Sequence, residues 1–434
     1  MTISLESKRD HKTLNFLFLL IPIFFLSSVS VSNLLCIVYL TTIFYYIKKY
    51  NLKIKTDILD LILFLFFCVI IISSLREIFL YNKSQIEILT LEIFEKLSII
   101  RFFFVYFLTK NILLHNLIRF ENFFKTSLFC TIFISINIIL MHLIGNDIFG
   151  NKEIANRFST IFGERAIAGT YLLNFFFFGL IFFYYLDKQN TLIRFFFIIL
   201  VGLGILLSFD RMPFLLFLIF FFFICILSIK KDYRLLIIMI TILPVFFLII
   251  LKYEKLYKRY VVTYIEVIAE KNFRVNKTED KIINYYSYGS IYKDSINIIF
   301  FEKTFIGSGK SSFSSRCKSY RLQTDKKSLK DGYFDACPRH THNLYLEILV
   351  SGGILSFFLF ISTIIIKFFL LAKYTFIKNS SYYLVNSILI ITLILEVFPF
   401  RSYGNIFNSY NGFFFFFKFA FVYVIVKNNI LKLK

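Results

Sequence analysis

Long apolar runs separated by short polar segments dominate this chain of 434 residues. A membrane-spanning helix needs about 20 predominantly apolar residues. Runs of suitable length lie at residues 14–29, 31–47, 57–74, 97–114, 126–144, 166–186, 191–208, 212–229, 235–252, 344–371, 382–400 and 412–426. The first two are short and only Ser27–Asn33 separates them, so the runs predict either twelve or eleven spanning helices. The predicted fold class is an all-α, polytopic membrane protein.

One long hydrophilic segment, residues 253–341, interrupts this series. It divides the chain into residues 1–252, with nine predicted spans, and residues 342–434, with three more. Within it, apolar spacing predicts a helix over Tyr253–Ile268 and an interfacial helix over Ile282–Phe305. The predicted organisation is therefore two groups of transmembrane helices joined by one large loop domain between helices 9 and 10.

Composition excludes several classes of protein. Hydrophobic residues make up 58% of the chain, and charged residues only 18%, against roughly 25% in an ordinary soluble domain. This excludes a soluble enzyme, a disordered chain and a nucleic-acid-binding protein, despite the formal net charge of +22. In a membrane protein, an excess of Lys and Arg indicates topology and contact with anionic membrane lipids.

The charges of the short loops predict the orientation. Lysines cluster in alternate short loops, for example at Lys48, Lys125 and Lys230. The positive-inside rule then places both termini in the cytoplasm and residues 253–341 outside. That loop holds 17 Lys and Arg against 10 Asp and Glu. Its excess of positive charge predicts an anionic partner, and a solvated basic surface near anionic lipid is the alternative.

The six cysteines fall into two groups. Four lie in apolar spans, where they are expected to be small buried hydrophobic residues: Cys36, Cys68, Cys130 and Cys225. Cys317 and Cys337 bracket a polar stretch of the outer loop. In an oxidising compartment they are candidates for a disulfide that closes this stretch.

Charged residues collect at the predicted outer ends of spans. Asp210 and Arg211 interrupt an otherwise apolar stretch, and ionisable residues at membrane depth are functional candidates. The planar guanidinium of Arg suits bidentate binding of phosphate oxygens, although the two residues could also form a self-satisfied turn. Arg157 and Arg165 precede the span at 166–186. Arg157 could simply extend to the interface, whereas Arg165 borders small residues that allow close approach of another group.

Two histidines stand directly before the span at 344–371. His340 and His342 are two residues apart, and a neutral imidazole can accept a proton near neutral pH. The positive end of the helix dipole is expected to lower the pKa of such a histidine. The neighbouring Asn343 could orient an imidazole or a sugar hydroxyl. A polar cap over a long span is the alternative, and the role of His340 stays open.

These motifs resemble a known family. The run from His342 to Glu347, followed by Gly352 and Gly353, is similar to the His-Asn element of the O-antigen ligase (WaaL-type) and Wzy-type O-antigen polymerase superfamily. Three other segments resemble further motifs of this superfamily: Arg157–Ser159, Ser208–Arg211 and Gly307–Gly309. The similarity is close over residues 150–360 and architectural elsewhere.

The resemblance implies a GT-C-like, metal-independent glycosyltransferase without a cofactor, in the bacterial inner membrane with its active site facing the periplasm. Its donor would be a glycan linked to undecaprenyl diphosphate. A ligase transfers the glycan to a sugar hydroxyl of lipid A–core, and a polymerase transfers it to another O-unit in lipopolysaccharide biosynthesis. By position, His342 would be the catalytic base, and Arg211 and Arg165 would bind the diphosphate.

One departure from the family pattern concerns the loop. Many members carry an arginine upstream of the Gly-x-Gly motif, where this chain has Lys293. Lys293 could bind the diphosphate, but an ammonium group cannot make the same bidentate contact.

Four functions remain open on the sequence. O-antigen ligation is the leading hypothesis, and polymerisation by the same chemistry is the second. Transport of a glycolipid or an anion is the third, and a related transfer, of a glycan to a protein or to another surface lipid, is the fourth. Transporters usually place ionisable residues near the middle of the membrane and contain repeated halves. Here the polar residues cluster at one face and no repeat is found, which favours an enzyme. Arg101, inside a predicted span, is the residue that best suits transport.

Overall fold

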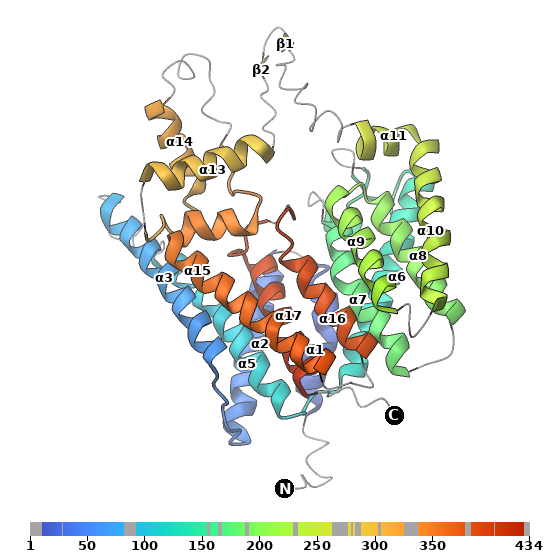
Figure 1. The fold of residues 1–434 in the computed structure, drawn as a ribbon, viewed down its shortest axis with the longest axis horizontal. Coiled ribbons are helices and arrows are strands. Elements are labelled where there is room, and N and C mark those ends of the chain that lie inside the picture. The colour runs from blue at the N-terminus through green and yellow to red at the C-terminus, as the bar shows by residue number, and fades with distance from the viewer. Residues whose placement is uncertain are drawn as a thin grey trace.

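The protein is a bundle of helices that run between two ends (Figure 1). The computed structural model describes residues 11–27, 29–81, 93–153, 157–163, 167–186, 191–228, 233–262, 277–278, 281–282, 288–302, 305–324, 337–377, 383–402 and 404–428. The helices of the bundle are α1 (Lys12–Phe24), α2 (Val29–Lys49), α3 (Ile58–Tyr81), α5 (Ile100–Leu114), α6 (Phe120–Ile144), α7 (Ala168–Leu186), α8 (Thr191–Leu207), α9 (Arg211–Ser228), α10 (Tyr233–Lys252), α15 (Leu344–Ala372), α16 (Tyr383–Glu396) and α17 (Ser409–Asn428).

The hydrophilic segment contributes short elements at one end of the bundle. They are α11 (Glu254–Tyr257), the π-helical turn η3 (Lys258–Val262), the paired strands β1 (Lys277–Thr278) and β2 (Lys281–Ile282), α13 (Tyr288–Glu302) and α14 (Phe313–Thr324). The two helices predicted in this segment therefore occur over shorter ranges, although residues 263–268 lie outside the described part of the chain. A 3-10 turn, η2 (Thr160–Phe162), and a π-helical turn, η5 (Lys373–Ile377), complete the described elements.

The helices agree with a polytopic membrane protein. Six described helices are long and apolar enough to cross a membrane. Six shorter apolar helices, α1, α7, α8, α9, α10 and α16, overlap the other predicted spans. Large apolar side chains such as Phe79, Phe196 and Phe369 are exposed on the outside of the bundle, where lipid would cover them. The count of twelve spans stays a prediction.

Helix α17 forms the core of the bundle. It packs against α2, α5, α15 and α16, and the phenylalanines from Phe413 to Phe417 are all buried. The rings of Phe413 and Tyr39 meet edge to face, with centroids 5.2 Å apart, a favourable geometry for aromatic pairs. A helix that is apolar on every side is expected to be buried on every side, which explains the position of α17.

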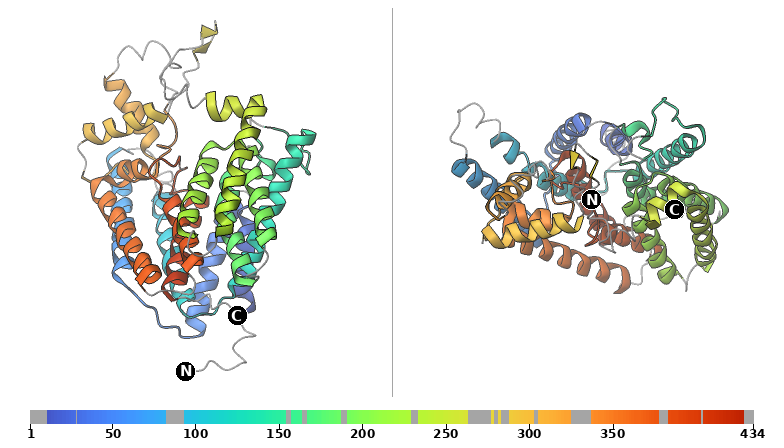
Figure 2. Two further views of the ribbon diagram at one scale, coloured as in Figure 1. Left: turned by 45° about the vertical axis from the view of Figure 1, so that its right-hand side comes forward. Right: turned by 90° about the horizontal axis from the view of Figure 1, so that it is seen from above.

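The two ends of the bundle differ. The start of α1 and the end of α17 lie at one end, and α11, α13 and α14 lie at the other, which we call the outer end (Figures 1 and 2). Helices α9 and α15 both begin at the outer end. The fold therefore brings Arg211, the first residue of α9, and His342, two residues before α15, to the same end of the molecule.

Candidate active site

An aspartate in the turn between α8 and α9 organises the first polar group of the outer end. Asp210 is buried, and its Oδ2 accepts a hydrogen bond of 3.0 Å from the backbone N–H of Gly169 in α7. Its Oδ1 lies 3.5 Å from a terminal guanidinium nitrogen of Arg157. The Arg157 side chain is 34% exposed. Asp210 therefore joins the turn before α9, the start of α7 and the segment that precedes η2.

Gly169 explains why α7 can approach this turn so closely. A Cβ atom at this position would lie 2.5 Å from Oγ of Ser208 and 2.8 Å from Cβ of Asp210. Any larger residue would push the turn away from α7 and lengthen the hydrogen bond to Asp210. Gly169 is one of the small residues that follow Arg165 in the sequence. It allows the backbone of α7 to pack closely on the turn before α9, as expected for glycine at such contacts.

A third arginine, which the sequence did not single out, joins this group. Nε of Arg259, in η3, donates a hydrogen bond of 3.3 Å to the carbonyl oxygen of Phe209. Burial lowers the pKa of Arg259, and the positive charges of Arg211 and Arg157 lower it further. We call Arg157, Asp210, Arg211 and Arg259 the arginine cluster. Arg157 and Arg259 act on the carboxylate of Asp210, and Arg211 acts on Arg259. Three guanidinium groups and one carboxylate leave an excess of positive charge, which favours an anion.

Burial also acts on the carboxylate of this cluster. It raises the pKa of Asp210 to about 6, although the charges of Arg157 and Arg259 and the N–H of Gly169 oppose the shift. With this pKa, Asp210 is mostly ionised at neutral pH and balances one of the three positive charges, and it loses its charge in mild acid.

The second polar group of the outer end is the histidine pair, His340 and His342. Their ring centroids lie 4.1 Å apart, and both residues are half-buried. Burial lowers the pKa of His342 below the ordinary value of 6.5. For His340, burial and the charge of His342 lower the pKa to about 4. Both imidazoles are therefore neutral at neutral pH, and burial is the main cause.

Hydrogen bonds to Glu347 of α15 hold the residue between the two histidines. The buried Thr341 donates from its backbone N–H and from its hydroxyl to Oε2 of Glu347, each at 3.1 Å. His342 itself has a positive φ of 56°, a conformation that costs free energy for a residue with a side chain. These contacts hold His342 in the strained conformation directly before α15.

Asn343 caps the helix that follows it, as in the alternative stated for the polar residues before this span. Its Oδ1 accepts hydrogen bonds from the N–H groups of Tyr345 and Leu346, so it is the N-cap of α15. Its Nδ2 donates to the carbonyl oxygen of Pro399 at 2.7 Å. The amide therefore fixes the start of α15 and attaches it to the segment after α16. In this structure it orients the helix rather than an imidazole.

The segment after α16 is tied in turn to the centre of the bundle. Arg401 lies 3.1 Å from the buried carboxylate of Glu396, which also accepts from Lys418 of α17. Lys418 donates as well to Asn174 of α7, at 3.1 Å. Because α7 carries Gly169, this chain of polar contacts connects the elements that bear the histidine pair and the arginine cluster.

The glycine motifs form a second attachment for α15. A Cβ at Gly307 would lie 2.4 Å from the backbone nitrogen of Gly353. Gly353 has a φ of 72° and marks a kink inside α15. The Gly-x-Gly segment of the loop thus packs backbone to backbone on the kink, which no larger residue would permit.

A disulfide also braces the histidine pair. Cys317 of α14 and Cys337 are bonded, with their Cα atoms 6.0 Å apart. Cys337 stands three residues before His340, and both half-cystines are buried against α13. The cross-link fixes the chain that leads into the histidine pair to the outer helices.

Two further residues were predicted for the site. Arg165 lies outside the described residues. Lys293 is exposed on α13, next to Asp294, and α13 lies at the outer end (Figure 1). In the part of the chain that the structure describes, no three His, Cys, Asp or Glu side chains gather in an arrangement that could hold a metal ion.

Arg101, the residue that best suited transport, lies at the start of α5. Its guanidinium donates to Oδ1 of Asn33 at 3.2 Å and to Oγ of Ser409 at 2.8 Å. These contacts tie α5 to α2 and to the start of α17. The candidate membrane span that contains Arg101, Ile93–Leu114, begins eight residues before it, so the position of this charge inside a span stays a prediction.

Fold and site together define an integral membrane protein with a polar site at one end of its helices. Residues 195–361 match the family model described as O-antigen ligase. The match confirms the predicted relation to the O-antigen ligase and Wzy-type superfamily. It spans Asp210, Arg211, Arg259 and the histidine pair, whereas Arg157 precedes it. No curated protein matches the chain in sequence.

This family implies a glycosyltransferase-like enzyme with a ligase or polymerase type of role. It also implies lipid-linked glycan substrates and an inner-membrane location, with which the apolar helices agree.

Proposed function

We propose that this protein is an O-antigen ligase, which transfers a glycan from undecaprenyl diphosphate to a sugar hydroxyl of lipid A–core on the periplasmic side. The observation that carries the proposal is the arginine cluster at the same end of the bundle as two neutral histidines. In the proposed orientation both chain termini are cytoplasmic, and the outer end faces the periplasm.

The arginine cluster suits the leaving group of this reaction. A diphosphate diester carries one negative charge on each phosphate, and the cluster has an excess of two positive charges. When the bond between the anomeric carbon and the diphosphate breaks, negative charge develops on the departing oxygen. Guanidinium groups fixed beforehand at a low-dielectric boundary stabilise that charge without reorganising.

The histidine pair suits activation of the acceptor. His342 is neutral because its pKa is lowered, so it can take the proton of the acceptor hydroxyl as the oxygen attacks the anomeric carbon. The new glycosidic bond replaces the bond to the diphosphate, and undecaprenyl diphosphate leaves. His340 lies against His342 and positions its ring. The proposed reaction needs no metal ion.

Polymerisation of O-units uses the same chemistry, and a deletion strain separates the two functions. For a ligase, we expect lipid A–core without any O-antigen, together with accumulated lipid-linked polymer. A polymerase would leave a single O-unit attached to the core, and an unchanged lipopolysaccharide ladder would contradict both functions.

A further inference from the structure

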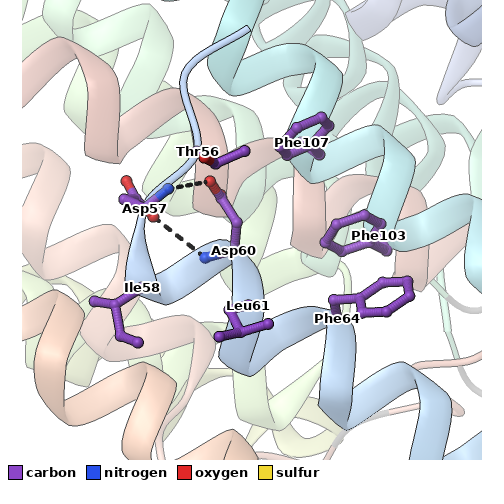
Figure 3. Close-up of a pocket in the computed structure, with 8 residues that line it drawn as sticks. All are labelled: Thr56, Asp57, Ile58, Asp60, Leu61, Phe64, Phe103 and Phe107. Carbon is purple, nitrogen blue, oxygen red and sulfur yellow. Dashed lines mark hydrogen bonds between the residues drawn. The ribbon is translucent and has the colours of Figure 1, made fainter.

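A pocket at the end of the bundle opposite the candidate active site has features of a ligand site. It lies between the start of α3 and α5, and its volume is about 520 Å3 (Figure 3). Phe64, Phe103 and Phe107 supply much of its wall, and Asp57 and Asp60 lie at its polar edge. Phe64 is 41% exposed on the outside of the bundle, so the pocket borders the space that lipid would fill.

The two aspartates cap α3 reciprocally. The backbone N–H of Asp57 donates to Oδ2 of Asp60 at 2.7 Å, and that of Asp60 donates to Oδ1 of Asp57 at 3.2 Å (Figure 3). This is the arrangement of a capping box. Lys110 of α5 pairs with both carboxylates. We call Asp57, Asp60 and Lys110 the α3 cap.

One carboxylate oxygen of the α3 cap accepts no hydrogen bond from the described residues. Asp60 is only 4% exposed, and its Oδ1 has no hydrogen-bond partner among the described residues. A buried carboxylate oxygen without a donor is costly, and such an atom at the edge of a pocket calls for a donor from outside. Lys110 and the buried Lys367 of α15 both act electrostatically on the two aspartates, so the free oxygen of Asp60, rather than an excess of charge, is what a ligand could satisfy.

From this combination we infer that the pocket binds a phospholipid whose headgroup carries a primary amine. The ammonium group would donate to Oδ1 of Asp60, and an acyl chain would lie along Phe64, Phe103 and Phe107. A lipid with an anionic headgroup lacks the positively charged ammonium group, and a lipid with a quaternary ammonium lacks the N–H donor. In the proposed orientation this site faces the cytoplasmic leaflet.

Lipid titration of the purified full-length protein in detergent, read by native mass spectrometry, tests this inference. The probes are phosphatidylethanolamine, phosphatidylcholine and phosphatidylglycerol with identical acyl chains. We expect the first tight adduct to form with phosphatidylethanolamine at a concentration about tenfold lower than with either other lipid, because only it makes a charge-assisted hydrogen bond to Asp60. Equal binding of the three lipids would overturn the inference.

Asp60→Asn probes the same atom with little change in shape. An asparagine oxygen can still accept the N–H of Asp57, while its NH2 group replaces the unpartnered acceptor by a donor. We expect this variant to lose the preference for phosphatidylethanolamine. Glu121→Gln, an exposed carboxylate at the start of α6, is the matched control and should keep the preference. If Asp60→Asn does not fold, the three-lipid comparison on the native chain decides alone.

A photoreactive acyl chain on phosphatidylethanolamine locates the bound lipid. We expect labelling of α3 or α5 near Phe64 and Phe107, and labelling confined to other helices would contradict the site. The inference does not depend on glycosyl transfer, so its failure would leave the proposed function unaffected.

Discussion

The arginine cluster and the α3 cap lie at opposite ends of the bundle and differ in how their charges are balanced. In the arginine cluster three cations meet one carboxylate, and the Arg157 side chain is 34% exposed. In the α3 cap two carboxylates hold one lysine, whose side chain is 1% exposed. The exposed excess of cations is suited to an incoming anion, whereas the enclosed lysine fixes two helices.

This difference teaches how to separate functional from structural charge in a membrane protein. A buried charged residue is a functional candidate only when its neighbours do not neutralise it and the net charge is accessible from solvent. Lys110 is more deeply buried than any arginine of the cluster, but its two aspartate partners account for it. Breaking that ion pair is expected to destabilise the fold, by about 3–5 kcal/mol for a buried pair.

The largest expected effect comes from His342 at the outer end. His342→Ala removes the proposed base, and we expect transfer to slow by about 10²–10⁴-fold, as for other general bases. The measurement is transfer of a labelled glycan from the lipid-linked donor by purified protein, with the thermal unfolding midpoint as a check of folding.

The matched control for this variant lies at the other end of the molecule. His115 bonds through Nε2 to the carbonyl oxygen of Lys53, at 3.0 Å, at the end that carries the α3 cap. His115→Ala should transfer glycan at the native rate. Native activity of purified His342→Ala would remove His342 from the role of base.

A smaller effect is expected when one of the cations proposed to bind the diphosphate is removed. Comparing variants of Arg259 and Lys293 shows which of these two residues contributes more. We expect Arg259→Ala to slow transfer by about 10²-fold, since loss of one fixed donor to a developing charge has effects of this order. Lys293→Ala should slow it at least about tenfold less, because Lys293 is exposed on α13 and an ammonium is a point charge. The same transfer assay, run under single-turnover conditions, measures both.

Arg259→Lys sharpens this test. The lysine keeps the charge but lacks the planar fork, so partial recovery is expected if charge and geometry both matter. If Lys293→Ala is the more damaging variant, the loop lysine rather than Arg259 completes the diphosphate site.

Much of the fold could be predicted from the sequence, because length and apolarity alone specify spanning helices. The predicted run at 344–371 coincides with α15 at Leu344–Ala372. The kink at Gly353 was not predicted, because it depends on backbone contact with Gly307, which is distant in the chain. Periodicity carries no information about such a contact.

The site was only partly predictable for a similar reason. Arg211 and His342 stood out because they break apolar stretches, whereas Arg259 lies in a loop rich in Lys and Arg, and only the fold brings it to Phe209. For Asn343 the sequence offered two interpretations, an orienting amide and a polar cap over the span. An asparagine directly before an apolar run is a strong N-cap, and this is its position in the structure.

The smallest expected effect is the response of the outer end to acid. His342 must be neutral to accept a proton, and its pKa is lowered from 6.5. The base is therefore present above this lowered pKa and is lost as the pH falls through it, so we expect the midpoint of the acid decline of kcat to lie below pH 6.5. Asp210, with a pKa of about 6, becomes protonated in the same range.

The two titrations act in opposite directions on the donor. Protonation of Asp210 removes the one carboxylate from the arginine cluster, so affinity for the diphosphate should rise while kcat falls, and KM for the donor should decrease in acid. Asp210→Asn, which keeps an acceptor for the N–H of Gly169, should abolish the change in KM and leave the decline of kcat in place. A decline of kcat centred at or above pH 6.5 would show that the base is not a buried imidazole with a lowered pKa. The proton transfer at the outer end would then have to be assigned to another group.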